Sequence, residues 1–283
     1  MVSIVVGEGY SVRIVGHGIT VAKDFVLAEG ISICSETPKI DSSFGSRTVG
    51  ELRNTLNVMA MENLADFSLL IEHADGGQKL ASKAWNALWL FNLLALSCRS
   101  PVFPLYSATE RGSQRFNLAN RNIVINQLPE IRSANDEDLA WAADHLERYN
   151  GLLAAERFQS ALRCYSNAHY LFDDEPKVML LWAGIEGLLD IDGELRRRIA
   201  MHAAILHDGN AEEKAAYFVK VRKAYDVRSR VVHGSGTDAK TLKSAYLLAS
   251  DILVGLLRKI VILGRVPTVA ELDHLAVRAS LEP

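Results

Sequence analysis

The feature that most constrains the fold is a succession of helical stripes in the second half of the chain. Beyond residue 133, apolar residues recur at spacings of three and four over several segments, and the connections between these segments are short. Amphipathic stripes of this kind bury their apolar faces by packing against one another. We therefore predict an all-α antiparallel helical bundle over residues 134–283. The stripes begin with Asp136–Tyr149 and end with the run from Leu242 to Ile260.

The first 50 residues follow another pattern, in which β-branched runs alternate with glycine. Such runs are typical of short strands joined by tight turns. A helical period follows from Glu51 to Cys98, and residues 102–133 are expected to be irregular around one strand at Asn122–Asn126. We therefore expect a small mixed α/β region over residues 1–133, which makes the whole chain α+β. The other expected strands are Ser3–Val6, Tyr10–Val15, Ile19–Ala22 and Phe25–Ile33, and the expected helix faces carry Leu56, Met59, Asn63 and Phe67, then Leu80, Ala84, Phe91 and Cys98.

Composition excludes several classes of protein. The chain is 49% hydrophobic and 23% charged, a balance that argues against a disordered tail. Its longest nearly apolar stretch, Trp85–Cys98, is shorter than the roughly 20 residues that span a bilayer. Because no membrane span and no secretory signal are visible, we expect a cytoplasmic protein. Three scattered cysteines exclude a disulfide framework and a cysteine zinc site.

Charge and histidine spacing do not by themselves indicate a ligand. The net charge is -3, and the small basic surplus in residues 151–265 is too weak to predict nucleic-acid binding. Glu271 and His274 have the spacing of a di-metal ligand pair, but the second pair that such a site needs is missing. Thr268 and Glu271 instead predict a capping box, and His202 is interpreted as a core histidine. We therefore expect no metal and no cofactor.

Two motifs of the C-terminal half stand apart from this background. The longer one reads Tyr225-Asp-Val-Arg228-Ser229-Arg230-Val-Val-His233-Gly-Ser-Gly. An arginine and a histidine are here joined by a polar residue and a Val-Val pair, and a glycine-rich exit follows. The second motif lies upstream and reads Trp182-Ala-Gly-Ile-Glu186-Gly-Leu-Leu, with a carboxylate in an otherwise apolar turn.

In this order the two motifs resemble the Apea-like branch of the HEPN superfamily, over about residues 150–263. The resemblance implies a metal-independent endoribonuclease of helical bundles, often found in antiviral defence or toxin systems. It implies that Arg228 and His233 are catalytic and meet near a homodimer interface. It also places Ser229 at the polar second position and Glu186 at the acidic position of the second bundle helix. The alternative is a catalytically silent HEPN module that binds RNA or a protein partner.

Helix geometry limits how these residues cooperate. Residues five apart lie about 140° apart around a regular helix, so Arg228 and His233 cannot both point at one phosphate. Either the helix ends at His233, as the following glycines suggest, or a second subunit helps. Ser229 shares a face with His233 and is placed to fix the tautomer of its ring. Tyr225 lies on that face too, where it either stacks a base or belongs to the core.

The remaining expectations concern charge and partners. An unpaired carboxylate at Glu186 would be costly, so we expect an arginine partner, either Arg228 or Arg230. A purely structural arginine–carboxylate pair is the competing interpretation of these residues. We expect RNA as the substrate, no membrane association, and a protein partner or sensor input through residues 1–133. A homodimer is expected through the last long helix, where a wide apolar arc comprises Leu248, Ile252, Leu253, Leu256 and Leu257.

Overall fold

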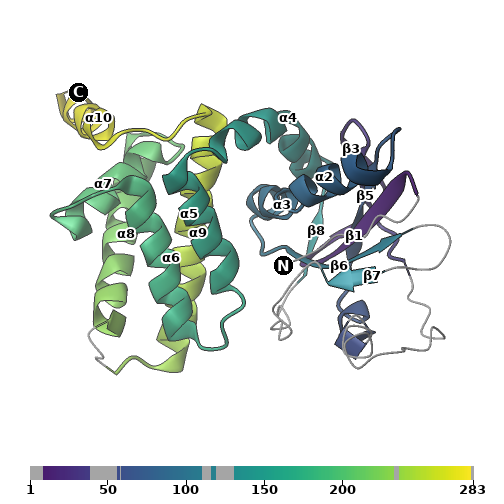
Figure 1. Ribbon diagram of the computed structural model, residues 1–283. Coiled ribbons are helices and arrows are strands. Elements are labelled where there is room, and N and C mark those ends of the chain that lie inside the picture. Colours follow the sequence, from purple (N-terminus) through teal and green to yellow (C-terminus); the bar gives the residue numbers. More distant parts are fainter. Residues whose placement is uncertain are drawn as a thin grey trace. The chain divides into compact units, whose positions relative to one another are not determined.

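The computed structural model describes residues 9–38, 56–57, 59–109, 116–118, 131–232 and 236–281. The chain divides into two compact units, Met1–Asp144 and His145–Pro283. The division falls within helix α4 (Asp136–Leu152), whereas the expected boundary at residue 133 precedes this helix. Figure 1 shows the sheet in the first unit and helices in the second, so the chain is α+β.

An antiparallel sheet forms the first unit. Within the described residues its six strands follow the order β3-β4-β5-β1-β6-β7, and β2 and β8 form a separate parallel pair. Helices α2 and α3 contact the central strands, and the rings of Phe67 and Phe91 lie 5.7 Å apart between sheet and helix. The elements are β1 Ser11–His17, β2 Ile19–Val21, β3 Phe25–Ala28, β4 Ile31–Cys34, β5 Phe67–Glu72, α2 Gly77–Ala87, α3 Leu90–Cys98, β6 Phe103–Thr109, β7 Phe116–Leu118 and β8 Arg132–Ala134.

Close packing of aromatic rings explains a glycine in the central strand. A Cβ atom on Gly16 would lie 2.4 Å from the ring of Phe67 and 2.7 Å from that of Phe91. The register of β1 against β6 also shifts between Val15 and Gly16. A larger residue at this position would therefore force the Phe67–Phe91 pair out of the core.

The structure corrects several expectations for this unit. Phe67 was expected on a helix face, but it begins β5, which lies between β4 and β1. Most of β5 is buried, so its sequence lacks the alternation that marks a half-exposed strand. Strand β6 lies in a region expected to be irregular, and the expected strand Phe25–Ile33 is the hairpin β3–β4. The expected strands Ser3–Val6 and Asn122–Asn126 lie outside the described residues.

The second unit is built around helix α9. This helix contacts α5, α6, α7 and α8, and most of its apolar side chains are buried. Asp238 caps its first turn by accepting a hydrogen bond from the backbone N–H of Thr241 at 2.9 Å, and Gly264 ends it with a φ of 68°. The helices are α5 Glu156–Ala168, α6 Asp174–Leu189, α7 Leu195–Leu206, α8 Ala211–Val232, α9 Ala239–Leu263 and α10 Val269–Leu281.

The central position of α9 corrects the interpretation of its wide apolar arc. Ile252, Leu253, Leu256 and Leu257 are all buried inside the unit itself, and Leu248 is partly buried. A helix that contacts four others needs apolar residues around most of its circumference. The arc therefore gives no support to a homodimer interface. Among the residues that the structure describes, no helix has the length and apolar character needed to cross a membrane.

We predict that Leu253→Ala lowers the free energy of unfolding by about 2–5 kcal/mol, because it leaves a cavity in the core of the second unit. Leu247→Ala is the matched control on the same helix, since Leu247 is 55% exposed, and it should change stability by less than about 0.5 kcal/mol. Guanidinium unfolding followed by circular dichroism measures both values. Equal effects of the two variants would contradict the central position of α9.

Candidate functional site at the contact of α6 and α8

The two sequence motifs meet where α6 packs against α8. Trp182 and Glu186 lie one turn apart on α6, and Tyr225 and Arg228 lie one turn apart on α8. The rings of Trp182 and Tyr225 meet edge to face, 5.3 Å apart with an interplanar angle of 88°. This aromatic contact brings the carboxylate of Glu186 and the guanidinium of Arg228 onto the same part of the helix interface.

Glu186 and Arg228 form an ion pair at this contact. Nη2 of Arg228 lies 2.9 Å from Oε1 of Glu186 and donates a hydrogen bond to Oε2 at 3.2 Å. The Arg228 guanidinium carbon also lies 5.3 Å from the centre of the Tyr225 ring. Each charged side chain is a little over one fifth exposed, so the pair is partly buried yet open to solvent on one side.

Burial governs the protonation of the groups in this pair. It raises the pKa of the Glu186 carboxyl above its ordinary value, and the positive charge of Arg228 opposes part of that rise. The Oε1 atom is itself buried and, within the described part of the chain, accepts no hydrogen bond. Burial, followed by the negative charge of Glu186, also raises the pKa of Tyr225. Among the described residues, Glu186 is therefore a partly buried carboxylate with Arg228 as its neighbouring cation.

The structure decides between alternatives that the sequence left open. Arg228, and not Arg230, is the partner of Glu186; Arg230 is exposed and lies about 200° around α8 from Arg228. Tyr225 is buried against Trp182 and belongs to the core. Ser229 is partly buried.

His233 lies outside the described residues, and so do Gly234 and Ser235. Its contact with Ser229 and the end of the helix at His233 therefore stay predictions.

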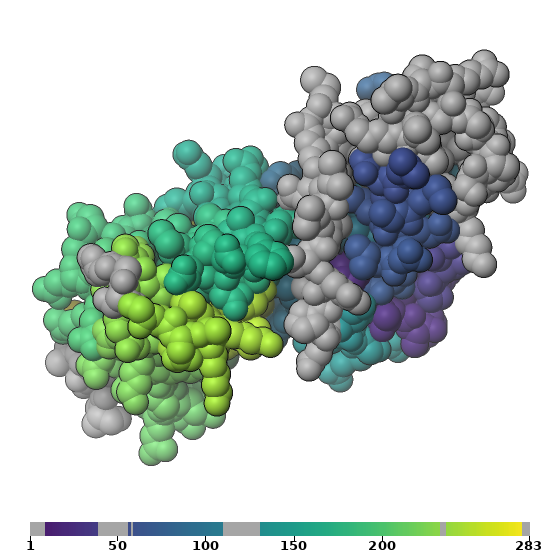
Figure 2. All heavy atoms as spheres, turned by 90° about the horizontal axis from the view of Figure 1, so that it is seen from below, coloured from purple at the N-terminus to yellow at the C-terminus, as the bar shows by residue number. Residues whose placement is uncertain are grey.

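Helix α8 is a surface helix, which leaves one side of the site accessible. Only Val221, Ala224 and Tyr225 of this helix are buried. Figure 2 shows the second unit from below, with green atoms of α8 and yellow-green atoms of the first part of α9 at its surface.

The other sequence candidates have structural roles. The N–H of Thr268 donates to Glu271 at 2.7 Å and the N–H of Glu271 donates back to Thr268 at 3.2 Å, which confirms the capping box. Hydrogen bonds from Thr268 and Arg265 lower the pKa of Glu271 to about 2. Across the described ranges, no group of three or more histidine, cysteine and acidic side chains is arranged to hold a metal ion.

His202 is fully buried, as expected of a core histidine, but it has a partner that the sequence did not reveal. Its Nε2 lies 2.8 Å from Oδ1 of Asp273, whose other oxygen accepts a hydrogen bond from Arg198 at 2.8 Å. Asp273 belongs to α10 and both partners belong to α7. The three side chains therefore attach α10 to α7, and no local sequence signal could have predicted this pairing.

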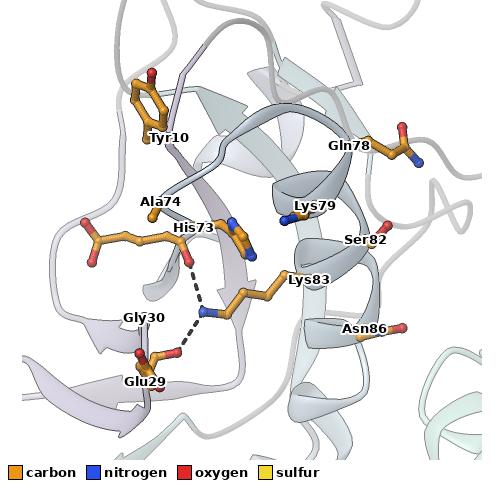
Figure 3. A pocket seen from close by; sticks show the side chains of 11 residues that line it. Tyr10, Glu29, Gly30, His73, Ala74, Gln78, Lys79, Ser82, Lys83 and Asn86 are labelled. Carbon is orange, nitrogen blue, oxygen red and sulfur yellow. Dashed lines mark hydrogen bonds between the residues drawn. The ribbon is translucent and has the colours of Figure 1, made fainter.

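A separate hollow lies in the first unit between α2 and the β3–β4 turn (Figure 3). Nζ of Lys83 donates hydrogen bonds to the backbone oxygens of Glu29 at 2.7 Å and Glu72 at 2.9 Å, which ties the turn to the helix. Two lysines, Lys83 and Lys79, are balanced by the two glutamates in its lining. Because the charges are mixed, the hollow favours neither an anion nor a cation.

Comparisons with protein-family models, with curated proteins and with solved structures give no match to this chain.

We predict that Glu186→Gln lowers the free energy of unfolding by no more than about 1 kcal/mol, because the charge that it removes beside Arg228 is partly exposed and is already disfavoured by burial. Arg230→Gln is the control, since the exposed Arg230 should contribute less than about 0.5 kcal/mol. Chemical denaturation measures both. No loss of stability in the Glu186 variant would mean that solvent, and not Glu186, neutralises Arg228.

Proposed function

We propose that the second unit is a metal-independent endoribonuclease of the HEPN type, in which Arg228 and His233 act at the scissile phosphate. The observation that carries this proposal is the meeting of the two motifs: Glu186 and Arg228 are 42 positions apart in the chain and their charged atoms lie 2.9 Å apart. The resemblance to the Apea-like branch requires these two motifs to share one site. Its association with antiviral defence or toxin systems is part of the same proposal.

Each residue type suits a step of RNA cleavage through the 2′-OH. The reaction needs a base for the 2′-OH proton, an acid for the leaving 5′-oxygen, and a cation for the charge that develops on the phosphorane. Histidine titrates near neutral pH, so His233 suits proton transfer. Arginine stays charged and bonds phosphate oxygens through a planar fork, so Arg228 suits charge stabilisation.

The surroundings of Arg228 support this role. Glu186 contacts Nη2 and the Tyr225 ring lies beside the guanidinium, so two neighbours orient the charged group in the absence of a ligand. A little over one fifth of the Arg228 side chain is exposed. A preorganised cation with one open side can meet a phosphate without a large rearrangement.

The proposal includes a homodimer in the cytoplasm, with RNA as substrate and with a partner or signal sensed by the first unit. The dimer is motivated by the angle of about 140° between residues five apart on a helix. Arg228 and His233 of one regular helix cannot both point at the same phosphate, whereas Arg228 of one subunit and His233 of the other can.

The rival proposal is a catalytically silent HEPN module that binds RNA or a protein. One observation favours it: Nη2 of Arg228 is already bound to Glu186, as it would be in a structural ion pair.

We predict that the purified protein cleaves single-stranded RNA in the presence of EDTA and leaves 2′,3′-cyclic phosphate or 3′-phosphate ends. Arg228→Ala and His233→Ala should each reduce the rate by about 10²–10⁴-fold, the usual size of an acid–base or oxyanion contribution. Gel electrophoresis of end-labelled RNA measures the rates and the product ends.

Arg230→Ala is the matched control for these variants, because Arg230 is an exposed arginine on the same helix. It should retain activity within a few fold. Activity that requires Mg²⁺, or that survives His233→Ala, would contradict the proposed mechanism. Stable RNA binding without cleavage would instead support the silent module.

We predict that a mixture of the two inactive variants, Arg228→Ala and His233→Ala, recovers activity after co-expression. If Arg228 of one subunit acts with His233 of the other, each mixed dimer keeps one intact site, and random pairing gives about a quarter of the wild-type rate. Light scattering at micromolar concentration reports the dimer. A fully active monomer, or a dimer without recovery, would contradict a site shared between subunits.

A further inference from the structure

We propose that phosphate binding at Arg228 is coupled to proton uptake by Glu186, so that the site binds RNA more tightly as the pH falls. This inference rests on the proposed function, because it takes an RNA phosphate as the ligand of Arg228. It adds a regulatory property to that site: Glu186 is the group that makes occupancy depend on pH.

The geometry gives Glu186 a single compensating charge. Among the described residues, the charged or titratable groups that face its carboxylate are Arg228 and Tyr225, both on α8. Asp190, the residue that caps the C-terminal end of α6, follows Glu186 by four positions, but its carboxylate is largely exposed and lies 3.6 Å from Nη1 of Arg157. The Oε1 atom of Glu186 is buried, and Nη2 of Arg228 contacts it at 2.9 Å without hydrogen-bond geometry. Arg228 is therefore the cation that favours the ionised form of this partly buried carboxylate.

A phosphate bound to Arg228 makes the ionised form of Glu186 less favourable in either of two ways. If Arg228 turns towards the phosphate, Glu186 keeps its partial burial and loses its cation. If Arg228 stays and offers its other nitrogens, the phosphate charge is added on the far side of the same guanidinium. Both arrangements disfavour the ionised carboxyl and favour the protonated form. Burial already raises the pKa of Glu186 in the absence of a ligand, which moves it towards the pH range where this uptake occurs.

The direction of the pH effect follows from linkage. A group whose pKa is higher in the complex than in the free protein takes up a proton on binding, so affinity increases as the pH falls between the two pKa values. One coupled proton changes affinity by at most about tenfold per pH unit. The protonated carboxyl no longer competes with the phosphate, and Glu186→Gln imitates that state at every pH.

The test uses the full-length protein and an RNA oligonucleotide made uncleavable by 2′-O-methyl groups. His233→Asn serves as the background, because a histidine near the phosphate would add its own titration. Dissociation constants are measured from pH 5 to pH 8 for this background and for its combination with Glu186→Gln. The background should bind several-fold more tightly at low pH. The double variant should show a flat profile and, at pH 7.5, bind more tightly than the background.

Two further measurements keep the outcome independent of protein stability. Calorimetry of the His233→Asn background in two buffers of different ionisation enthalpy counts the protons taken up and needs no change at Glu186. Arg230→Gln in the same background should leave the pH profile unchanged, because Arg230 lies on the opposite side of α8. A merely destabilised Glu186→Gln variant would not bind more tightly than its parent.

The possible results separate this inference from the proposed function. The inference would be overturned, and the RNA site would stand, if RNA binding had the same pH profile with and without Glu186 and took up no proton. Absence of RNA binding in both the wild type and the Arg228→Ala variant would refute the proposed function itself. A pH profile that is lost only with Glu186 would support both.

Discussion

A partly buried carboxylate in an apolar helix turn is costly to keep charged without a cation beside it, and this constraint accounts for the ion pair between α6 and α8. Glu186 is that carboxylate, and Arg228 meets it at 2.9 Å. Because neighbouring residues of a helix point about 100° apart, one rotation of α8 places both Arg228 on Glu186 and Tyr225 on Trp182. The same rotation directs Asp226 towards α7, where it pairs with Arg196 at 2.6 Å.

Much of the helical unit could be predicted from the sequence, because helical periodicity is local. The sheet was harder to predict. Strand β5 is buried between two neighbours, so its Phe-Ser-Leu-Leu-Ile-Glu sequence lacks the alternation of a half-exposed strand and was assigned to a helix. The surroundings of α9 could not be predicted either. From the sequence alone, an apolar arc that is covered by four neighbouring helices looks the same as an arc that binds a second subunit. Leu253 belongs to the first kind, because it is buried in the core of its own unit.

In the site, too, local motifs could be recognised from the sequence, whereas contacts between residues far apart in the chain could not. Arg228, Tyr225 and Glu186 were all identified from two short motifs, and the need for an arginine beside Glu186 followed from burial alone. Which arginine it would be depended on the rotation of α8, which only the fold determines. His202 and Asp273 are 71 positions apart on two different helices, and no spacing rule connects them. The catalytic roles of Arg228 and His233 both stay predictions, and His233 lies outside the described residues.

The central claim is that Arg228 receives the phosphate at which RNA is cleaved. A crystal structure of the protein with an uncleavable 2′-O-methyl RNA tests it most directly. The account predicts a phosphate oxygen within about 3 Å of a guanidinium nitrogen of Arg228, with the imidazole of a His233 on the same phosphate. RNA held elsewhere on the protein, with Arg228 bound only to Glu186, would contradict the account.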